Sequence, residues 1–158
     1  MNDQEGLAWA IFSLADMLGL QGEYARAQVL YEESLAVQRK LGNKRGITRA
    51  LRHSAMFLFV SQGDPQNIQA RIGDSLTLCK ELGDPEGIAS GTWLSGWITF
   101  SQGDLAAAQS LLEESVGLFR EIGSRWYLAW SLSVLARVKA QQGENVWQRV
   151  LVLRSVWR

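Results

Sequence analysis

A motif that recurs about every 40 residues constrains this chain more than any other feature of its sequence. A glycine followed by an acidic residue occurs at Gly22, Gly63, Gly103 and Gly143, and each of these glycines follows a glutamine. The steps between them are 41, 40 and 40 residues. Because a fixed period of this length is typical of repeat architectures, the fold is expected to be an array of similar units.

A second glycine marker divides each unit into two helices. It is preceded by Leu or Ile and followed by Asn, Asp or Ser, and it occurs at Gly42, Gly83 and Gly123. Glycine readily adopts the left-handed conformation that ends a helix, and Asn, Asp or Ser can cap the helix that follows. Between the markers, apolar residues recur at steps of three and four, as between 105 and 119. Each unit is therefore predicted to be a helical hairpin.

Seven regular helices and an eighth, less regular one are predicted. The hairpins must stack, because no single hairpin can bury its own apolar face. In the second unit, an extra residue between Ala55 and Gly63, and Ile68 where a small residue is expected, suggest a bulged or shifted helix. The expected helices span 5–20, 24–41, 46–62, 65–82, 86–102, 105–122, 125–142 and 145–157.

The residues expected to pack between helices resemble those of the tetratricopeptide repeat family. Small residues stand twelve positions apart at Ala15 and Ala27, and Tyr31 follows four positions later. The third unit repeats the spacing with Gly96 and Ala108. The period exceeds the usual 34 residues of the family. Together with the segment QGEYARAQVLYEESLAVQRKLGN, it is similar to a longer variant found in helical arms of bacterial signalling regulators and ATPases.

This resemblance implies an all-α fold, a right-handed α-solenoid of about four helical hairpins. The repeat array is expected to cover residues 1–144. Its units are expected at about 5–41, 46–82, 86–122 and 125–157. A chain that starts so close to an inter-repeat turn suggests a piece of a longer array.

The segment 145–158 departs from the repeat pattern. It contains no acidic residue, and Arg149, Arg154 and Arg158 make it basic. As a helix, it would carry a wide apolar face, which predicts that it caps the array or mediates self-association, with a homodimer as one result. That face consists of Val146, Val150, Leu153 and Trp157.

In the tetratricopeptide family the first helix of each hairpin lines a concave groove, and the register set by Ala15 assigns groove residues in this chain. The assigned residues are aromatic residues and arginines. These types dominate binding hot spots, because rigid aromatic rings bury much area and arginine adds forked donors. The alternative is that the tryptophans fill space between helices and that the arginines lie on solvated surfaces. The expected groove residues are Trp9, Phe12, Arg49, Arg52, Trp93, Trp97, Phe100, Trp130 and Arg137.

The expected function is a non-enzymatic scaffold that binds a protein or peptide segment in this groove. One alternative is a sensory or regulatory arm of a larger signalling protein, and another is a self-association element that uses the C-terminal helix. No nucleophile, base and orienting group can be assembled from the sequence, so no enzymatic activity is expected. No cofactor or metal is expected either, because His53 is the only histidine and Cys79 is expected to be a buried thiol.

The charge balance argues against nucleic acid and membrane surfaces as partners. Sixteen basic residues offset sixteen acidic ones, so there is no overall positive field to attract phosphate groups. The densest apolar run, 56–60, is too short to span a bilayer, and the N-terminus does not resemble a signal peptide. A single cysteine and this N-terminus favour a cytoplasmic location.

Overall fold

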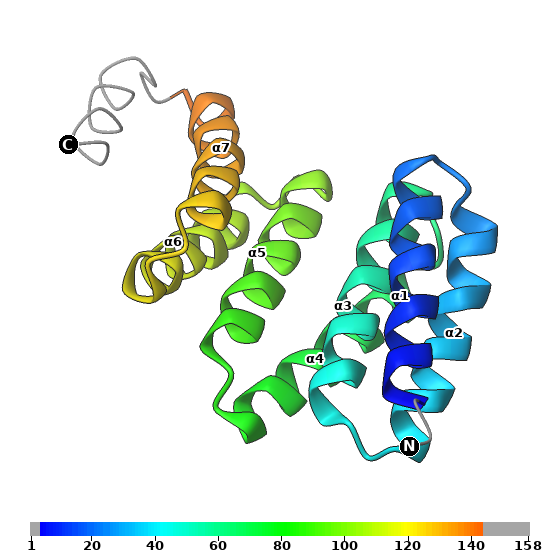
Figure 1. Cartoon of the computed structure of the whole chain (residues 1–158). Helices are drawn as coiled ribbons and strands as arrows, with labels where there is room; N and C mark the ends of the chain where they lie inside the picture. Colours follow the sequence, from blue (N-terminus) through cyan, green and yellow to red (C-terminus); the bar gives the residue numbers. More distant parts are fainter. Residues whose placement is uncertain (1–3, 144–158) are drawn as a thin grey trace. The chain divides into compact units, whose positions relative to one another are not determined.

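The computed structural model describes residues 4–143, which form seven α-helices joined by short turns and contain no β-strand (Figure 1). Every bound lies within two residues of its prediction, so the all-α fold is confirmed. The predicted eighth helix lies outside the described residues. The helices are α1 (Gln4–Leu20), α2 (Tyr24–Lys40), α3 (Lys44–Val60), α4 (Pro65–Leu82), α5 (Pro85–Ser101), α6 (Leu105–Ile122) and α7 (Arg125–Gln141).

The chain divides within α5 into two compact units, the first ending at Gly91 and the second beginning at Thr92. In the first unit, α2 packs against both α1 and α3, α3 packs against α4, and α1 contacts α3. In the second unit, α6 packs against α7. Because turns of three or four residues join α1 to α4, consecutive helices of the first unit run in opposite directions and pack side by side as hairpins.

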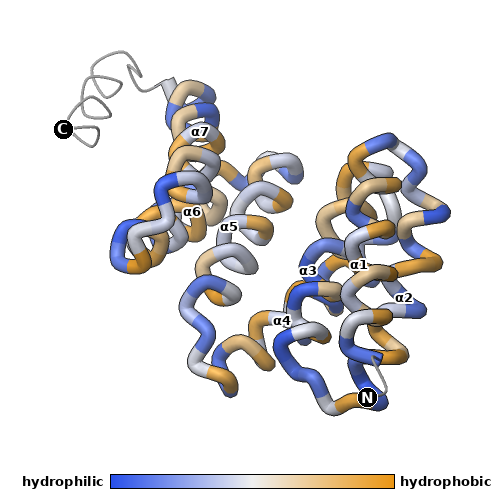
Figure 2. Tube along the Cα trace, in the orientation of Figure 1, coloured by the Kyte–Doolittle hydropathy of each residue, from blue (hydrophilic) through white to orange (hydrophobic). Residues whose placement is uncertain are grey.

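Small residues and one tyrosine build the core of the first unit. Ala15, Ala27 and Tyr31, which carry the family resemblance, are all fully buried. Small side chains at the crossing points allow the helices to approach closely, and Tyr31 then fills the space between Phe12 and Phe57. Figure 2 shows hydrophobic residues interspersed with hydrophilic ones along helices such as α2 and α6, as expected of helices with one buried side.

Most of the predicted helix caps are present. The carboxylate or amide oxygens of Asn43, Asp64, Asp84 and Asp104 accept hydrogen bonds from backbone N–H groups two or three residues later, at 3.0 to 3.2 Å. Each bond satisfies a donor that the first turn of a helix leaves free. At Ser124 the side chain makes no such bond, so the predicted serine cap is wrong.

The extra residue of the second unit lies in the turn between α3 and α4. Both α1 and α3 have 17 residues, so the predicted bulge or shift within a helix is wrong. The N–H of Gly63 bonds to the carbonyl of Leu58, and the N–H of Gln62 bonds to the carbonyl of Phe59. This pairing is the one that ends many helices, and it puts Gln62 in the left-handed conformation, with φ 57°, where glycine usually stands.

Replacing Gln62 by glycine is expected to stabilise the protein by about 1 kcal/mol, because a side chain in the left-handed region costs about that much. Gln102 precedes the glycine of the corresponding turn in the next unit and has no positive φ. Gln102→Gly is therefore the matched control and should not stabilise the fold. Urea denaturation of both variants measures the difference, and equal effects would contradict the strain at Gln62.

Candidate functional site

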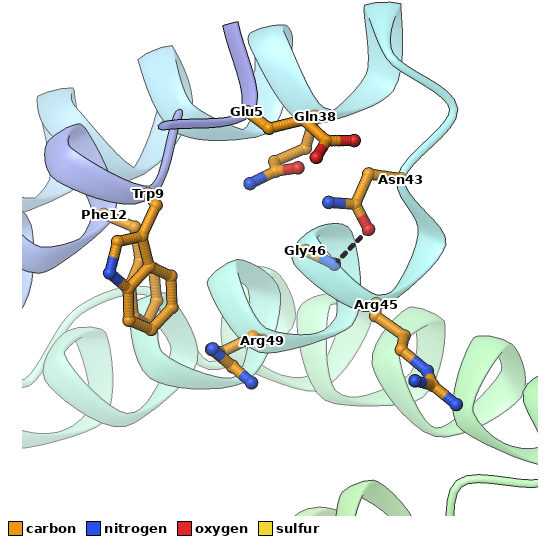
Figure 3. A pocket seen from close by; sticks show the side chains of 8 residues that line it. All are labelled: Glu5, Trp9, Phe12, Gln38, Asn43, Arg45, Gly46 and Arg49. Carbon is orange, nitrogen blue, oxygen red and sulfur yellow. Dashed lines mark hydrogen bonds between the residues drawn. The ribbon is translucent and has the colours of Figure 1, made fainter. Parts of the chain in front are cut away.

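A pocket of about 350 Å³ opens between α1 and α3 in the first unit (Figure 3). We call it the α1–α3 pocket. Helix α1 supplies one wall, α3 supplies the opposite wall, and α2 and the α2–α3 turn close one end. The lining residues are Glu5, Trp9, Phe12, Gln38, Asn43, Arg45, Gly46 and Arg49.

An arginine and a tryptophan face each other across this pocket. The guanidinium carbon of Arg49 lies 4.9 Å from the centre of the Trp9 ring, within the range of a cation–π contact. Trp9 stacks on Phe12 with 5.4 Å between ring centres. Phe12 is buried, whereas Trp9 remains 51% exposed. The core thus holds Phe12, Phe12 supports Trp9, and Trp9 holds the guanidinium of Arg49 at the pocket.

The arginines of the pocket have no acidic partner within the described residues. No carboxylate of residues 4–143 forms a salt bridge with Arg45 or Arg49, although both side chains are exposed. Glu5 lines the opposite side of the pocket (Figure 3). Since two cations and one anion line it, the α1–α3 pocket carries a net positive charge.

A buried amide forms the far wall. Gln38 is 5% exposed, and its Oε1 atom has no hydrogen-bond partner within residues 4–143. Its amide lies against Gly46, where an added Cβ would come within 2.3 Å of the Gln38 side chain. The first turn of α3 is fixed beside it by a hydrogen bond of 3.1 Å from the Gly46 N–H to Asn43 (Figure 3). Glycine is therefore the residue that permits this close contact.

The carboxylate of Asp16, on α1, already contacts two other groups. The phenol of Tyr31 donates a hydrogen bond to its carboxylate, and Nδ1 of His53 lies 2.9 Å from the same oxygen. Burial raises the pKa of the Tyr31 phenol far above its usual range, and the hydrogen bond to Asp16 and its negative charge raise it further. Asp16 thus holds α1, α2 and α3 together.

The second unit contains a cluster of four tryptophans. The ring of Trp93 lies 5.4 Å from that of Trp97 and 6.0 Å from that of Trp130, and Trp126 lies 6.5 Å from Trp130. Trp126 and Trp130 are exposed, whereas Trp93 is buried. This Trp93–Trp130 cluster combines an internal ring with outer rings that solvent can reach.

The chain matches a protein-family model over part of its length. A model described as tetratricopeptide repeat matches residues 7–43, which include most of α1 and all of α2. The family predicted from Ala15, Ala27 and Tyr31 is therefore confirmed for this segment, and Trp9 and Phe12 stand on the first helix of the matched repeat. Tetratricopeptide repeats generally serve as scaffolds for protein interactions.

The comparison with solved structures shows the fold. The chain is similar to the crystal structure of BtubC (BKLC) from P. vanneervenii, with a TM-score of 0.81 and 16% sequence identity. The match covers 99% of this chain and 66% of that one, so this chain spans slightly less than two thirds of its length. The likeness supports the predicted α-solenoid. No curated protein matches the chain.

Four groove residues were predicted in the first unit, and three of them line one pocket. Trp9, Phe12 and Arg49 line the α1–α3 pocket, and Arg52 is half-buried one turn further along α3. Phe12 is buried, which fits the alternative that some predicted groove aromatics fill space between helices. Of the four predicted residues, only Trp9 and Arg49 combine exposure with a position in the pocket.

In the second unit, the predicted residues form two groups. Trp93, Trp97 and Trp130 belong to the cluster described above, and the guanidinium of Arg137 lies 5.4 Å from the centre of the Phe100 ring. Trp93 and Phe100 are buried. The residues predicted for self-association lie outside the described residues, and these are Val146, Val150, Leu153 and Trp157.

Sequence reasoning missed five residues of the α1–α3 pocket and one of the cluster. Arg45 and Trp126 each stand four positions before a predicted residue, so helical spacing could have found them. Gln38 and Asn43 come from the second helix and the turn, where the family register gives no signal. The missed residues are Glu5, Gln38, Asn43, Arg45, Gly46 and Trp126.

No helix in the part of the chain that the structure describes is long and apolar enough to cross a membrane.

Proposed function

We propose that this chain is a non-enzymatic scaffold that binds a segment of a partner protein in the α1–α3 pocket. The observation that supports this most strongly is the pair formed by Trp9 and Arg49. A half-exposed tryptophan offers apolar area at low entropic cost, and the arginine above it offers several N–H donors. The pair thus provides an apolar contact and a charged contact side by side.

The charges of the pocket favour an acidic segment. Arg45 and Arg49 stand four residues apart on α3, so both guanidinium groups can reach one side of a bound chain. Asp16 is occupied by Tyr31 and His53, which leaves Glu5 as the acidic residue of the pocket lining. A segment with a carboxylate next to an apolar side chain would pair with Arg49 and pack on Trp9.

The second unit has an exposed aromatic surface of its own. Trp126 and Trp130 are 71% and 48% exposed there, which is high for tryptophan, a residue that is mostly buried in folded proteins. We include the Trp93–Trp130 cluster as a second contact region of the same scaffold. The variants below change the first unit alone, so they test the α1–α3 pocket separately from this cluster.

Selection of peptides from a random display library on the full chain tests the proposal. We expect the enriched sequences to contain Asp or Glu next to a large apolar residue. Fluorescence anisotropy with a labelled selected peptide should then show that Trp9→Ala and Arg49→Ala each weaken binding about thirtyfold, which corresponds to the loss of about 2 kcal/mol that marks a hot-spot residue.

Arg39→Ala is the matched control, because Arg39 is an exposed arginine on α2 that does not line the pocket. It should leave the affinity unchanged, and circular dichroism should show all three variants to be folded. A selected peptide that binds the wild type and both pocket variants equally well would show that the α1–α3 pocket is not the site.

A further inference from the structure

The side of α1 that points away from the core is apolar and exposed. We call it the outer face of α1 and define it by Leu7, Ala10, Leu14 and Met17. Leu7, Leu14 and Met17 are 54%, 52% and 58% exposed, and Ala10 is also exposed. Isolated exposed apolar residues are ordinary on protein surfaces, but a contiguous stripe along one helix indicates an interaction surface.

The corresponding face of α3 shows what this kind of surface contacts. Forty residues after Ala10, Leu14 and Met17 stand Ala50, Ser54 and Phe57 on α3, and all three are buried. There they meet α2. Phe57 stacks on Tyr31 with 6.1 Å between ring centres, and the Ser54 hydroxyl donates to Gln28 at 2.6 Å.

The repeat therefore builds this face for contact with another helix. In α1 the polar serine is replaced by Leu14, so the surface is more apolar than its counterpart in α3. Both charged residues of α1, Glu5 and Asp16, lie on the other side of the helix, toward the space between α1 and α3. The outer face of α1 thus has no charge that would keep an apolar helix away.

We propose that the outer face of α1 binds the same face of a second copy of this chain, with the two helices antiparallel. The residues stand at steps of three, four and three, the spacing of an apolar seam between paired helices. This pattern reads the same in both directions. Leu7 would lie opposite Met17 of the partner subunit, and Ala10 opposite Leu14 of the partner subunit. One patch on each copy then makes a closed two-fold interface.

The side-chain sizes and the absence of charge on the outer face of α1 also suit this pairing. Ala10 is small, so it leaves room for the leucine that stands opposite it in the antiparallel register. Because the outer face carries no charged residue, the two copies would meet without bringing like charges together. This surface lies on the side of α1 away from the α1–α3 pocket, so both could be occupied at once, and the proposal stands independently of the peptide-binding function.

Sedimentation equilibrium of the full chain over a concentration series tests the proposal. We expect a dimer for the wild type, and we expect Leu14→Arg and Met17→Arg each to weaken it at least about tenfold, since each would bury a charge in the interface. Val29→Arg is the matched control, because Val29 is 59% exposed on α2 and lies outside the outer face of α1. It should leave the dimer intact.

Thiol cross-linking tests the antiparallel register. A mixture of Leu7→Cys and Met17→Cys chains should form a cross-linked pair, whereas neither variant should cross-link to itself, and the buried Cys79 should stay unreactive. A wild-type monomer at all concentrations would overturn the proposal. So would a dimer that survives Leu14→Arg and is lost on Leu153→Arg, which would place the interface in the C-terminal segment. Cross-links of Leu7→Cys to itself would replace the antiparallel arrangement with a parallel one.

Discussion

Tyr31→Ala is expected to lower the free energy of unfolding by about 4 kcal/mol, near the upper end for a single truncation. Tyr31 is fully buried, and its ring contacts Phe12 and Phe57 at 5.9 and 6.1 Å between centres. Its hydroxyl donates to Asp16, a carboxylate that also contacts His53 of α3. The substitution would therefore leave a cavity at the point where three helices meet and would remove a charged hydrogen bond.

Urea denaturation followed by circular dichroism measures this loss. Tyr24→Ala is the matched control, because Tyr24 lies on the same helix and contacts the same Phe57 ring, at 6.3 Å, but is only partly buried. It should cost about 1 kcal/mol, because the site is open to solvent and can relax. Similar losses for the two variants would show that Tyr31 does not have the central position in the core that its burial indicates.

The helices could be predicted closely because their ends are fixed by local chemistry. Helix α6 illustrates this, since Asp104 caps its first turn and Gly123 ends it in the left-handed conformation. Both residues act on backbone groups within a few positions along the chain. The spacing of such residues therefore carries nearly all the information that a helix boundary needs.

The turn after α3 could not be predicted because its form depends on packing between helices and not on local chemistry. The sequence shows that one residue is added between Ala55 and Gly63, but either a bulged helix or a longer turn would accommodate it. The choice depends on the fit of α3 against its neighbours: α3 keeps the length of α1, and Phe57 packs on Gly19 and Tyr31. The added residue is then left to the turn, and Gln62 takes the conformation that glycine takes elsewhere.

The candidate site was predictable only in part. The family register assigned both Trp9 and Trp93 to the groove, yet Trp9 is half-exposed and Trp93 is buried. The difference arises because Trp93 packs against Trp97 of its own helix and Trp130 of α7, a contact that no single-helix pattern contains. Gln38 enters the α1–α3 pocket in the same way, through the packing of α2 against its neighbours.

Tyr31 also makes the stability of the protein depend on pH in the alkaline range. Because burial and the nearby Asp16 raise the pKa of Tyr31 in the folded protein, its phenol keeps its proton there above pH 10. In the unfolded chain, a tyrosine loses its proton near pH 10. Above that pH the folded state binds one more proton than the unfolded state, so the free energy of unfolding falls by about 1.4 kcal/mol per pH unit from this residue.

Tyr31→Phe isolates this contribution from the other groups that titrate in the same range. At neutral pH the variant should be less stable than the wild type by about 2 kcal/mol, because it lacks a hydrogen bond to a charged carboxylate. The variant has no phenol to ionise at this position, so its stability should fall less steeply above pH 10. Urea denaturation at several pH values should show the gap narrowing to near zero at about pH 11.5. Parallel curves for the two proteins would mean that the Tyr31 phenol titrates alike in the folded and unfolded states.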